Sequence, residues 1–130
     1  GIRLGRLCRR IHFLHAAFDG QEVGNSWKDG TVVGRYVIHR KDLPDESRPL
    51  ALGPQLGLLY REPAATNSAT APNVAWTSSA ENSLRLGRTT RLYHMTWENP
   101  KPDAMVEMID FLPELNSPVS PVLFAITVEN

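Results

Sequence analysis

The sequence lacks most of the compositional features that would assign it to a specialised class of protein. It has one cysteine, Cys8, in 130 residues. A single thiol cannot form an internal disulfide, which excludes a small secreted domain held together by disulfides. The 14 basic and 14 acidic residues give a net charge of zero. No excess of charge therefore favours a nucleic-acid partner or an anionic membrane surface.

Long apolar runs and a recognisable signal peptide are also missing. A transmembrane helix needs about 20 consecutive apolar residues, and no segment approaches that length. These two absences leave the compartment open. The chain begins with strand-like sequence at Gly1 and stops at Asn130, directly after a strand-like segment. We therefore expect residues 1–130 to be one β-sandwich module excised from a longer protein, with enough residues to bury a core.

The charges are unevenly distributed along the chain. Basic residues crowd the start, whereas the segment from Asp103 onward contains acids and no bases. We expect the two terminal segments to lie side by side, so that their charges compensate each other. An exposed basic arm is the alternative interpretation. The basic residues concerned are Arg3, Arg6, Arg9 and Arg10.

Short apolar segments with alternating character predict an all-β protein. In residues 90–97, for example, Tyr93, Met95 and Trp97 share one face, because side chains alternate along a strand. Turn signals such as Asp29-Gly30 separate the segments, since glycine adopts positive φ without strain. The predicted strands are residues 7–18, 32–40, 48–52, 56–60, 74–77, 90–97, 106–112 and 122–129.

The strand predicted at residues 106–112 follows a corner at Pro100 and Pro102. Proline donates no backbone hydrogen bond, so strand pairing should stop at that corner. A helix over residues 103–112 is the competing interpretation, because several residues there favour helix. We predict a strand. Residues 78–87 and the proline-containing residues 61–73 are expected to be loops, and the whole pattern predicts an antiparallel β-sandwich of jelly-roll type.

Three parts of the sequence, in this order, resemble a known family. They are residues 10–16, residues 29–39, and residues 96–111 together with 123–129. They are similar to the galactose-binding-domain-like jelly-roll modules of bacterial multidomain proteins and glycoside hydrolases. The resemblance covers most of the chain and implies an antiparallel sandwich of eight or nine strands that is usually non-catalytic. It further implies carbohydrate binding through loops at one rim, and in some members a structural calcium ion.

Aromatic residues supply the candidate binding site. Sugar rings have apolar faces that stack on Trp and Tyr, while amide and carboxylate groups bind their hydroxyls. Trp27 lies in a polar loop with Asn25 and Asp29 beside it, and Tyr60 and Trp76 flank a second loop. We expect these five residues to border one rim of the sandwich. The alternative is that the tryptophans cap the ends of the sandwich.

A structural calcium site is the candidate metal site. Asp19, Glu22 and Asp29 lie in the first loop, and Glu129 ends the last strand. Calcium prefers several oxygen ligands, including backbone carbonyls. If the first loop meets the end of the last strand, Asp19, Glu22 and Glu129 would bind the ion.

No group of residues predicts an enzyme. His12 and His15 point to opposite faces of a strand, and His39 could meet His94 only if their strands were neighbours. Cys8 has no glycine-flanked turn and no partner at a recognisable spacing. A glycosidase needs two carboxyl groups facing one cleft, and nothing in the sequence brings such a pair together. The carboxylates considered are Glu98, Asp103, Glu107 and Asp110.

These observations favour a non-catalytic accessory module that binds carbohydrate through rim loops. The alternative is a structural or protein-interaction domain that docks onto neighbouring domains of its parent protein. An aromatic cleft at one rim would favour carbohydrate, whereas exposed apolar residues on a sheet face would favour docking. An enzyme acting on a small molecule is a third possibility, which would need convergent polar groups.

Overall fold

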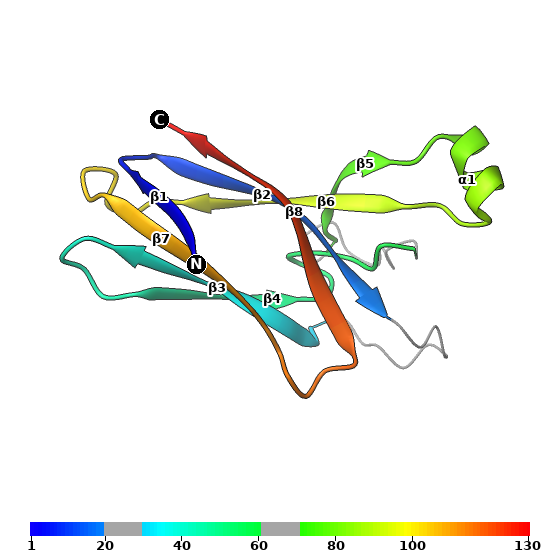
Figure 1. Cartoon of the computed structure of the whole chain (residues 1–130), viewed down its shortest axis with the longest axis horizontal. Coiled ribbons are helices and arrows are strands. Elements are labelled where there is room, and N and C mark those ends of the chain that lie inside the picture. The colour runs from blue at the N-terminus through cyan, green and yellow to red at the C-terminus, as the bar shows by residue number, and fades with distance from the viewer. Residues whose placement is uncertain (20–29, 61–70) are drawn as a thin grey trace.

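The computed structural model describes residues 1–19, 30–60 and 71–130, and they form two facing antiparallel sheets (Figure 1). The first sheet has the strand order β1-β7-β3-β4 and the second sheet the order β5-β6-β2-β8. The predicted β-sandwich is confirmed, while its jelly-roll connectivity stays a prediction. The elements are β1 (Ile2–Arg6), β2 (Arg10–Asp19), β3 (Val32–Arg40), β4 (Glu46–Ala51), β5 (Asn73–Thr77), α1 (Ala80–Leu86), β6 (Arg91–Glu98), β7 (Val106–Pro113) and β8 (Val119–Glu129).

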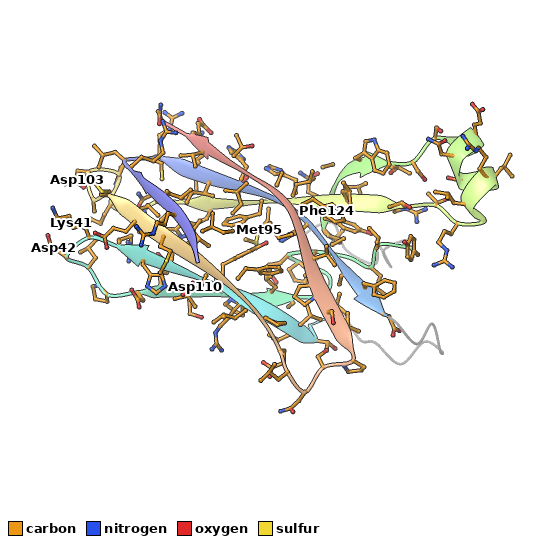
Figure 2. All side chains as sticks on the ribbon, in the orientation of Figure 1. Lys41, Asp42, Met95, Asp103, Asp110 and Phe124 are labelled. Atoms are coloured by element: carbon orange, nitrogen blue, oxygen red, sulfur yellow. The ribbon has the colours of Figure 1, made fainter. Side chains whose placement is uncertain are left out.

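The core lies between the two sheets and follows the predicted alternation of side chains. Tyr93 and Trp97 are buried there, and the partly buried Met95 of the same strand packs against the core (Figure 2). Tyr36 on β3 stacks on Phe13 of the opposite sheet, with ring centroids 4.0 Å apart. These aromatic contacts join the sheets at the centre of the sandwich.

Residues 106–113 form the strand β7, so the strand prediction is confirmed and the helix alternative is wrong. The strand pairs with both β1 and β3, which places it inside the first sheet. Ile109 is fully buried and lies opposite Ile38. Membership of a sheet with a buried inner face outweighs the local helix preference of residues 103–108.

The strand predicted at residues 56–60 is not formed. Leu56 is fully buried, but this segment makes only isolated bridges, at Leu56 and Leu58. Two backbone hydrogen bonds attach it to Ala17, from Ala17 N to Gly57 O at 2.9 Å and from Leu59 N to Ala17 O at 2.8 Å. The segment also packs closely against Tyr93, because a Cβ atom at Gly57 would collide with the Tyr93 ring, 2.5 Å from its Cζ. The leucines therefore indicate burial without extended pairing.

The loop predicted at residues 78–87 contains the helix α1. Ser79 caps its start, accepting a hydrogen bond on Oγ from Asn82 N at 3.1 Å, and Gly87 ends it with φ +70°. These are the expected residue types at the two ends of a helix. The helix buries none of its residues, so it lacks the apolar periodicity by which helices are predicted. In the described residues no helix is long and apolar enough to span a membrane.

The start and end of the chain lie side by side, as the charge distribution predicted. Strand β8 pairs with β2 along the whole length of β2, from Arg10 opposite Glu129 to Asp19 opposite Val119. Glu129 Oε1 accepts hydrogen bonds from Arg9 at 2.6 Å and from Arg10 at 3.0 Å. Charge compensation is thus confirmed for these two arginines.

The corner after β6 is held by the buried side chain of Asn99. Its Nδ2 donates to Cys8 O at 2.9 Å, and its Oδ1 accepts from Lys101 N at 3.0 Å. Its backbone N donates to Arg9 O at 2.9 Å. One residue therefore links the loop before β2 to the loop before β7.

Replacing Asn99 with alanine should lower the free energy of unfolding by about 1–3 kcal/mol, because it leaves the Cys8 carbonyl and the Lys101 amide without their partner. Urea unfolding followed by tryptophan fluorescence measures this. The matched control is Asn116→Ala, which removes an exposed amide and should change stability by less than about 0.5 kcal/mol. Equal effects of the two substitutions would contradict the assigned role of Asn99.

Candidate functional site

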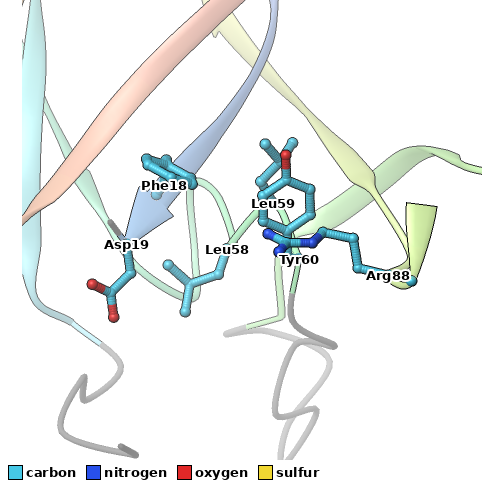
Figure 3. Close-up of a pocket in the computed structure, with 8 residues that line it drawn as sticks. Phe18, Asp19, Leu58, Leu59, Tyr60 and Arg88 are labelled. Carbon is cyan, nitrogen blue, oxygen red and sulfur yellow. The ribbon is translucent and has the colours of Figure 1, made fainter. Parts of the chain in front are cut away.

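A pocket of about 310 Å³ opens at one end of the sandwich (Figure 3). We call it the rim pocket. Three segments that are distant in the sequence form it: the end of β2, the segment after Leu56, and the turn that follows α1. Its described lining residues are Ala17, Phe18, Asp19, Leu58, Leu59, Tyr60, Gly87 and Arg88.

Local backbone structure explains how the three segments meet. Phe18 and Asp19 are the last residues of β2, and the hydrogen bonds of Ala17 bring residues 57–59 alongside that strand. Leu59 O also accepts from Arg91 N at 2.8 Å, which attaches the segment to the start of β6. The left-handed conformation of Gly87 ends α1 and redirects the chain, so that Arg88 reaches the pocket.

Two aromatic rings and a guanidinium group dominate the pocket. The rings of Phe18 and Tyr60 meet edge to face, with centroids 6.1 Å apart. Arg88 Cζ lies 4.4 Å from the centroid of the Tyr60 ring, which is the geometry of a cation–π contact. Figure 3 shows the Arg88 side chain extended across Tyr60, with the Asp19 carboxylate near the opposite edge. The site thus offers apolar ring surface next to one cation and one anion.

The structure brings together only part of the predicted binding site. Tyr60 lines the rim pocket, and Trp76 does not. Trp76 is about half exposed on β5, opposite Leu92 of β6. The other three predicted residues, Trp27, Asn25 and Asp29, lie outside the described residues.

Sequence reasoning missed Phe18 and Arg88. Phe18 is the last apolar residue before the Asp19-Gly20 turn signal, and a strand end beside a turn is where a rim residue would be sought. Arg88 follows the helix-ending Gly87, but the helix itself was not predicted. No signal along the sequence connected either residue with Tyr60.

We compared the chain with protein-family models, curated protein sequences and solved structures. None of them matches. A β-sandwich by itself does not define a function, because one fold serves many.

The structure does not bring together the predicted calcium ligands. Asp19 and Glu129 are at opposite ends of the paired strands β2 and β8, about 30 Å apart for a ten-residue strand. Glu22 lies outside the described residues. The Glu129 carboxylate binds His12, Arg9 and Arg10, and these contacts lower its pKa to about 2, with the His12 hydrogen bond contributing most. Asp19 and Glu129 therefore cannot bind the same ion.

The cysteine and the carboxylates weighed for catalysis are dispersed over the molecule. Cys8 is buried, and burial raises the pKa of its thiol, which disfavours the nucleophilic thiolate. Figure 2 shows Asp103 at the end farthest from α1 and Asp110 on the first sheet. Asp110 binds His39 Nε2 at 2.8 Å, whereas Glu98 binds Arg10 on the second sheet. In the part of the chain that the structure describes, these carboxylates do not form a pair across a cleft.

Proposed function

We propose that this protein is a non-catalytic module that binds carbohydrate at the rim pocket. The observation that carries the proposal is the exposed pair of rings, Phe18 and Tyr60, next to the charged groups of Arg88 and Asp19. A sugar presents C–H groups on its faces and hydroxyls on its edge. Aromatic rings pack against the C–H groups, and guanidinium and carboxylate groups form hydrogen bonds with the hydroxyls.

The contact between Arg88 and Tyr60 supports this reading of the pocket. The guanidinium lies over one face of the tyrosine ring, and its position is held there before any ligand arrives. A sugar would pack against the ring surface of Phe18 and Tyr60 that remains exposed, while Arg88 and Asp19 reach its hydroxyls from two sides. Side chains that are already oriented lose little conformational freedom on binding.

Replacing Tyr60 with alanine should weaken glycan binding about tenfold, because it removes one stacking partner worth about 1–1.5 kcal/mol. Titration calorimetry with a panel of soluble polysaccharides measures the affinity. The matched control is Phe124→Ala, which removes another exposed aromatic ring away from the pocket. Saturable binding that survives Tyr60→Ala and Phe18→Ala unchanged would contradict the assignment of the site.

Docking onto a neighbouring domain of the parent protein is the second candidate function. It is favoured by the segment of β5 and α1, which extends beyond one end of the sandwich (Figure 1). Every residue of β5 is exposed, and Leu84 on α1 is 85% exposed. A helix of this length is not stable on its own in water, so a covering partner would stabilise it. If the folded protein bound no polysaccharide of the panel, that result would favour docking over carbohydrate binding.

A further inference from the structure

His39 lies between two carboxylates on the outer face of the first sheet. It points outward because the preceding Ile38 is buried in the core and side chains alternate along a strand. Its Nδ1 lies 2.9 Å from Asp45 Oδ1, and its Nε2 lies 2.8 Å from Asp110 Oδ2. Asp110 comes from the neighbouring strand β7, and Asp45 comes from the turn between β3 and β4. The histidine ring therefore connects that turn to β7.

Both contacts require the His39 ring to carry two protons. A carboxylate only accepts hydrogen bonds, so each ring nitrogen must donate, and only the imidazolium ion can donate from both. A neutral ring keeps one donor, and the lone pair of its other nitrogen would face a negatively charged oxygen. Loss of one proton from His39 therefore breaks one of the two contacts.

The contact to Asp45 is the one that can open. Asp110 belongs to a strand that is paired on both sides, and its other carboxylate oxygen lies 3.6 Å from the amino group of Gly1. The Asp45 side chain is 57% exposed, against 30% for Asp110, and it belongs to a turn. A released Asp45 carboxylate can therefore turn into water, whereas Asp110 keeps its place beside the ring.

The turn of residues 41–45 depends on contacts of this kind. One backbone anchor is the hydrogen bond from Lys41 N to Met105 O at 2.9 Å. Asp42 has φ +58°, in the left-handed region that residues other than glycine seldom occupy. Such a conformation persists only where the surrounding structure holds it. The contact between Asp45 and the histidine is part of that surrounding structure.

We propose that His39 is a proton-operated latch for the turn of residues 41–45. The imidazolium ring holds the turn closed against the first sheet, and loss of the proton releases Asp45 and loosens the turn. The two carboxylates raise the pKa of His39, and the Asp110 hydrogen bond contributes most. The latch is therefore closed at pH 6.5 and below, and it opens as the pH rises through the raised pKa of His39.

Further charged groups lie near the latch. Arg3 and Glu107, which have opposite charges, line the groove beside His39. On the side of the turn, one glutamate is paired with two arginines. These three residues are Glu46, Arg40 and Arg48. The two aspartates that bind the ring nitrogens therefore govern the proton on His39 most directly.

The turn also forms one wall of a groove of about 600 Å³. Lys41 and Asp42 line the groove from the turn, and Lys101 and Met105 line it from the loop before β7. Figure 2 shows Lys41 and Asp42 at the end of the sandwich farthest from α1. Opening the latch should therefore change the shape of this groove and leave the rim pocket, at the other end, unaffected.

NMR of the whole chain between pH 6 and pH 9 tests the latch. We expect both ring nitrogens of His39 to carry protons at pH 6, and the Asp45 carboxyl carbon to shift along the same titration curve as the ring. At pH 6, Asp45→Ala should lower the hydrogen-exchange protection of the Lys41 amide about threefold to fivefold, which is the range for an exposed ion pair. The same substitution should move the His39 titration to lower pH.

The matched control is Asp42→Asn, which removes a neighbouring charge of the same turn. Asparagine tolerates the left-handed conformation, so this variant should leave the protection of the Lys41 amide nearly unchanged. His39→Gln should make the turn independent of pH. If that variant does not fold, Asp45→Ala still decides, because it alters an exposed turn residue. The proposal is overturned if the ring is neutral at pH 6, if the Asp45 carbon does not follow the ring, or if Asp45→Ala leaves the His39 titration in place.

Discussion

Replacing Tyr36 with alanine should lower the free energy of unfolding by about 4 kcal/mol. Tyr36 is fully buried at the centre of the sandwich. Its ring contacts Phe13 on the opposite sheet and Phe111 on its own sheet, with centroid distances of 4.0 Å and 5.3 Å. Alanine would leave a cavity the size of the ring and would remove the aromatic contacts between the sheets. Urea unfolding at pH 7 measures the loss.

The matched control for this prediction is Tyr36→Phe, which keeps the ring and removes only the hydroxyl. That hydroxyl donates to His15 Nδ1 over 2.8 Å, and burial raises the pKa of the phenol, so it remains protonated. Losing one buried hydrogen bond should cost about 1–2 kcal/mol. If Tyr36→Ala cost no more than Tyr36→Phe, the ring would not be the central packing element described above.

Lowering the pH from 7 to 4 should remove about 3 kcal/mol of stability through His15 alone. His15 is fully buried, and its Nε2 donates to Gln55 O at 2.8 Å. Nδ1 therefore accepts from Tyr36, so both nitrogens are satisfied by the neutral ring. Burial lowers the pKa of His15 to about 4. The unfolded chain binds this proton near pH 6.5, so between pH 6.5 and 4 it binds more protons than the folded chain and stability falls with pH.

Other ionisable groups contribute outside this window or at its lower edge. Hydrogen bonds to Asp110 and Asp45 raise the pKa of His39, so its stabilisation is complete below pH 6.5 and is lost as the pH rises above it. The pKa values of Asp110 and Glu129 are lowered, chiefly by their histidine partners. Their stabilisation is lost only as the pH falls below about 4.5. Among the described groups with shifted pKa values, His15 is therefore the one that changes stability between pH 6.5 and 4.5.

Urea unfolding of the wild type and of His15→Gln at several pH values tests this assignment. Glutamine can still donate to the Gln55 carbonyl, but it does not titrate. The variant should be less stable at pH 7 and nearly independent of pH from 6.5 to 4.5, so that the two curves approach each other on acidification. Parallel curves would mean that another group causes the acid sensitivity.

The strands were predictable because their signal is local. Residues 32–40 were predicted as a strand, and β3 spans Val32–Arg40. The alternation of Tyr93, Met95 and Trp97 identified the buried face of β6, because a strand with one buried face has a period of two. The helix α1 escaped prediction for the same reason, since it buries no face and leaves no periodic pattern. The leucines of residues 56–60 gave a misleading strand signal, because they are apolar and packed without belonging to a sheet.

The candidate binding residues were predictable only where the type and position of a single residue indicated a binding role. Tyr60 was identifiable as an aromatic residue beside a long loop. Its neighbours in the rim pocket, Phe18 and Arg88, come from other segments that reach it through the fold. The contact between His39 and Asp110 spans 71 positions of sequence. It depends on β3 and β7 being neighbours in a particular register.

The sequence by itself determined the all-β class, most of the strands and which of their residues face the core, because these follow from local side-chain patterns. Only the tertiary structure decided which strands are neighbours, and with that the rim pocket, the two partners of His39 and the separation of Asp19 from Glu129. The physical reason is that backbone hydrogen bonds between strands are alike for any pair of strands. Pairing and register are selected by the packing of the whole core, which no single segment encodes.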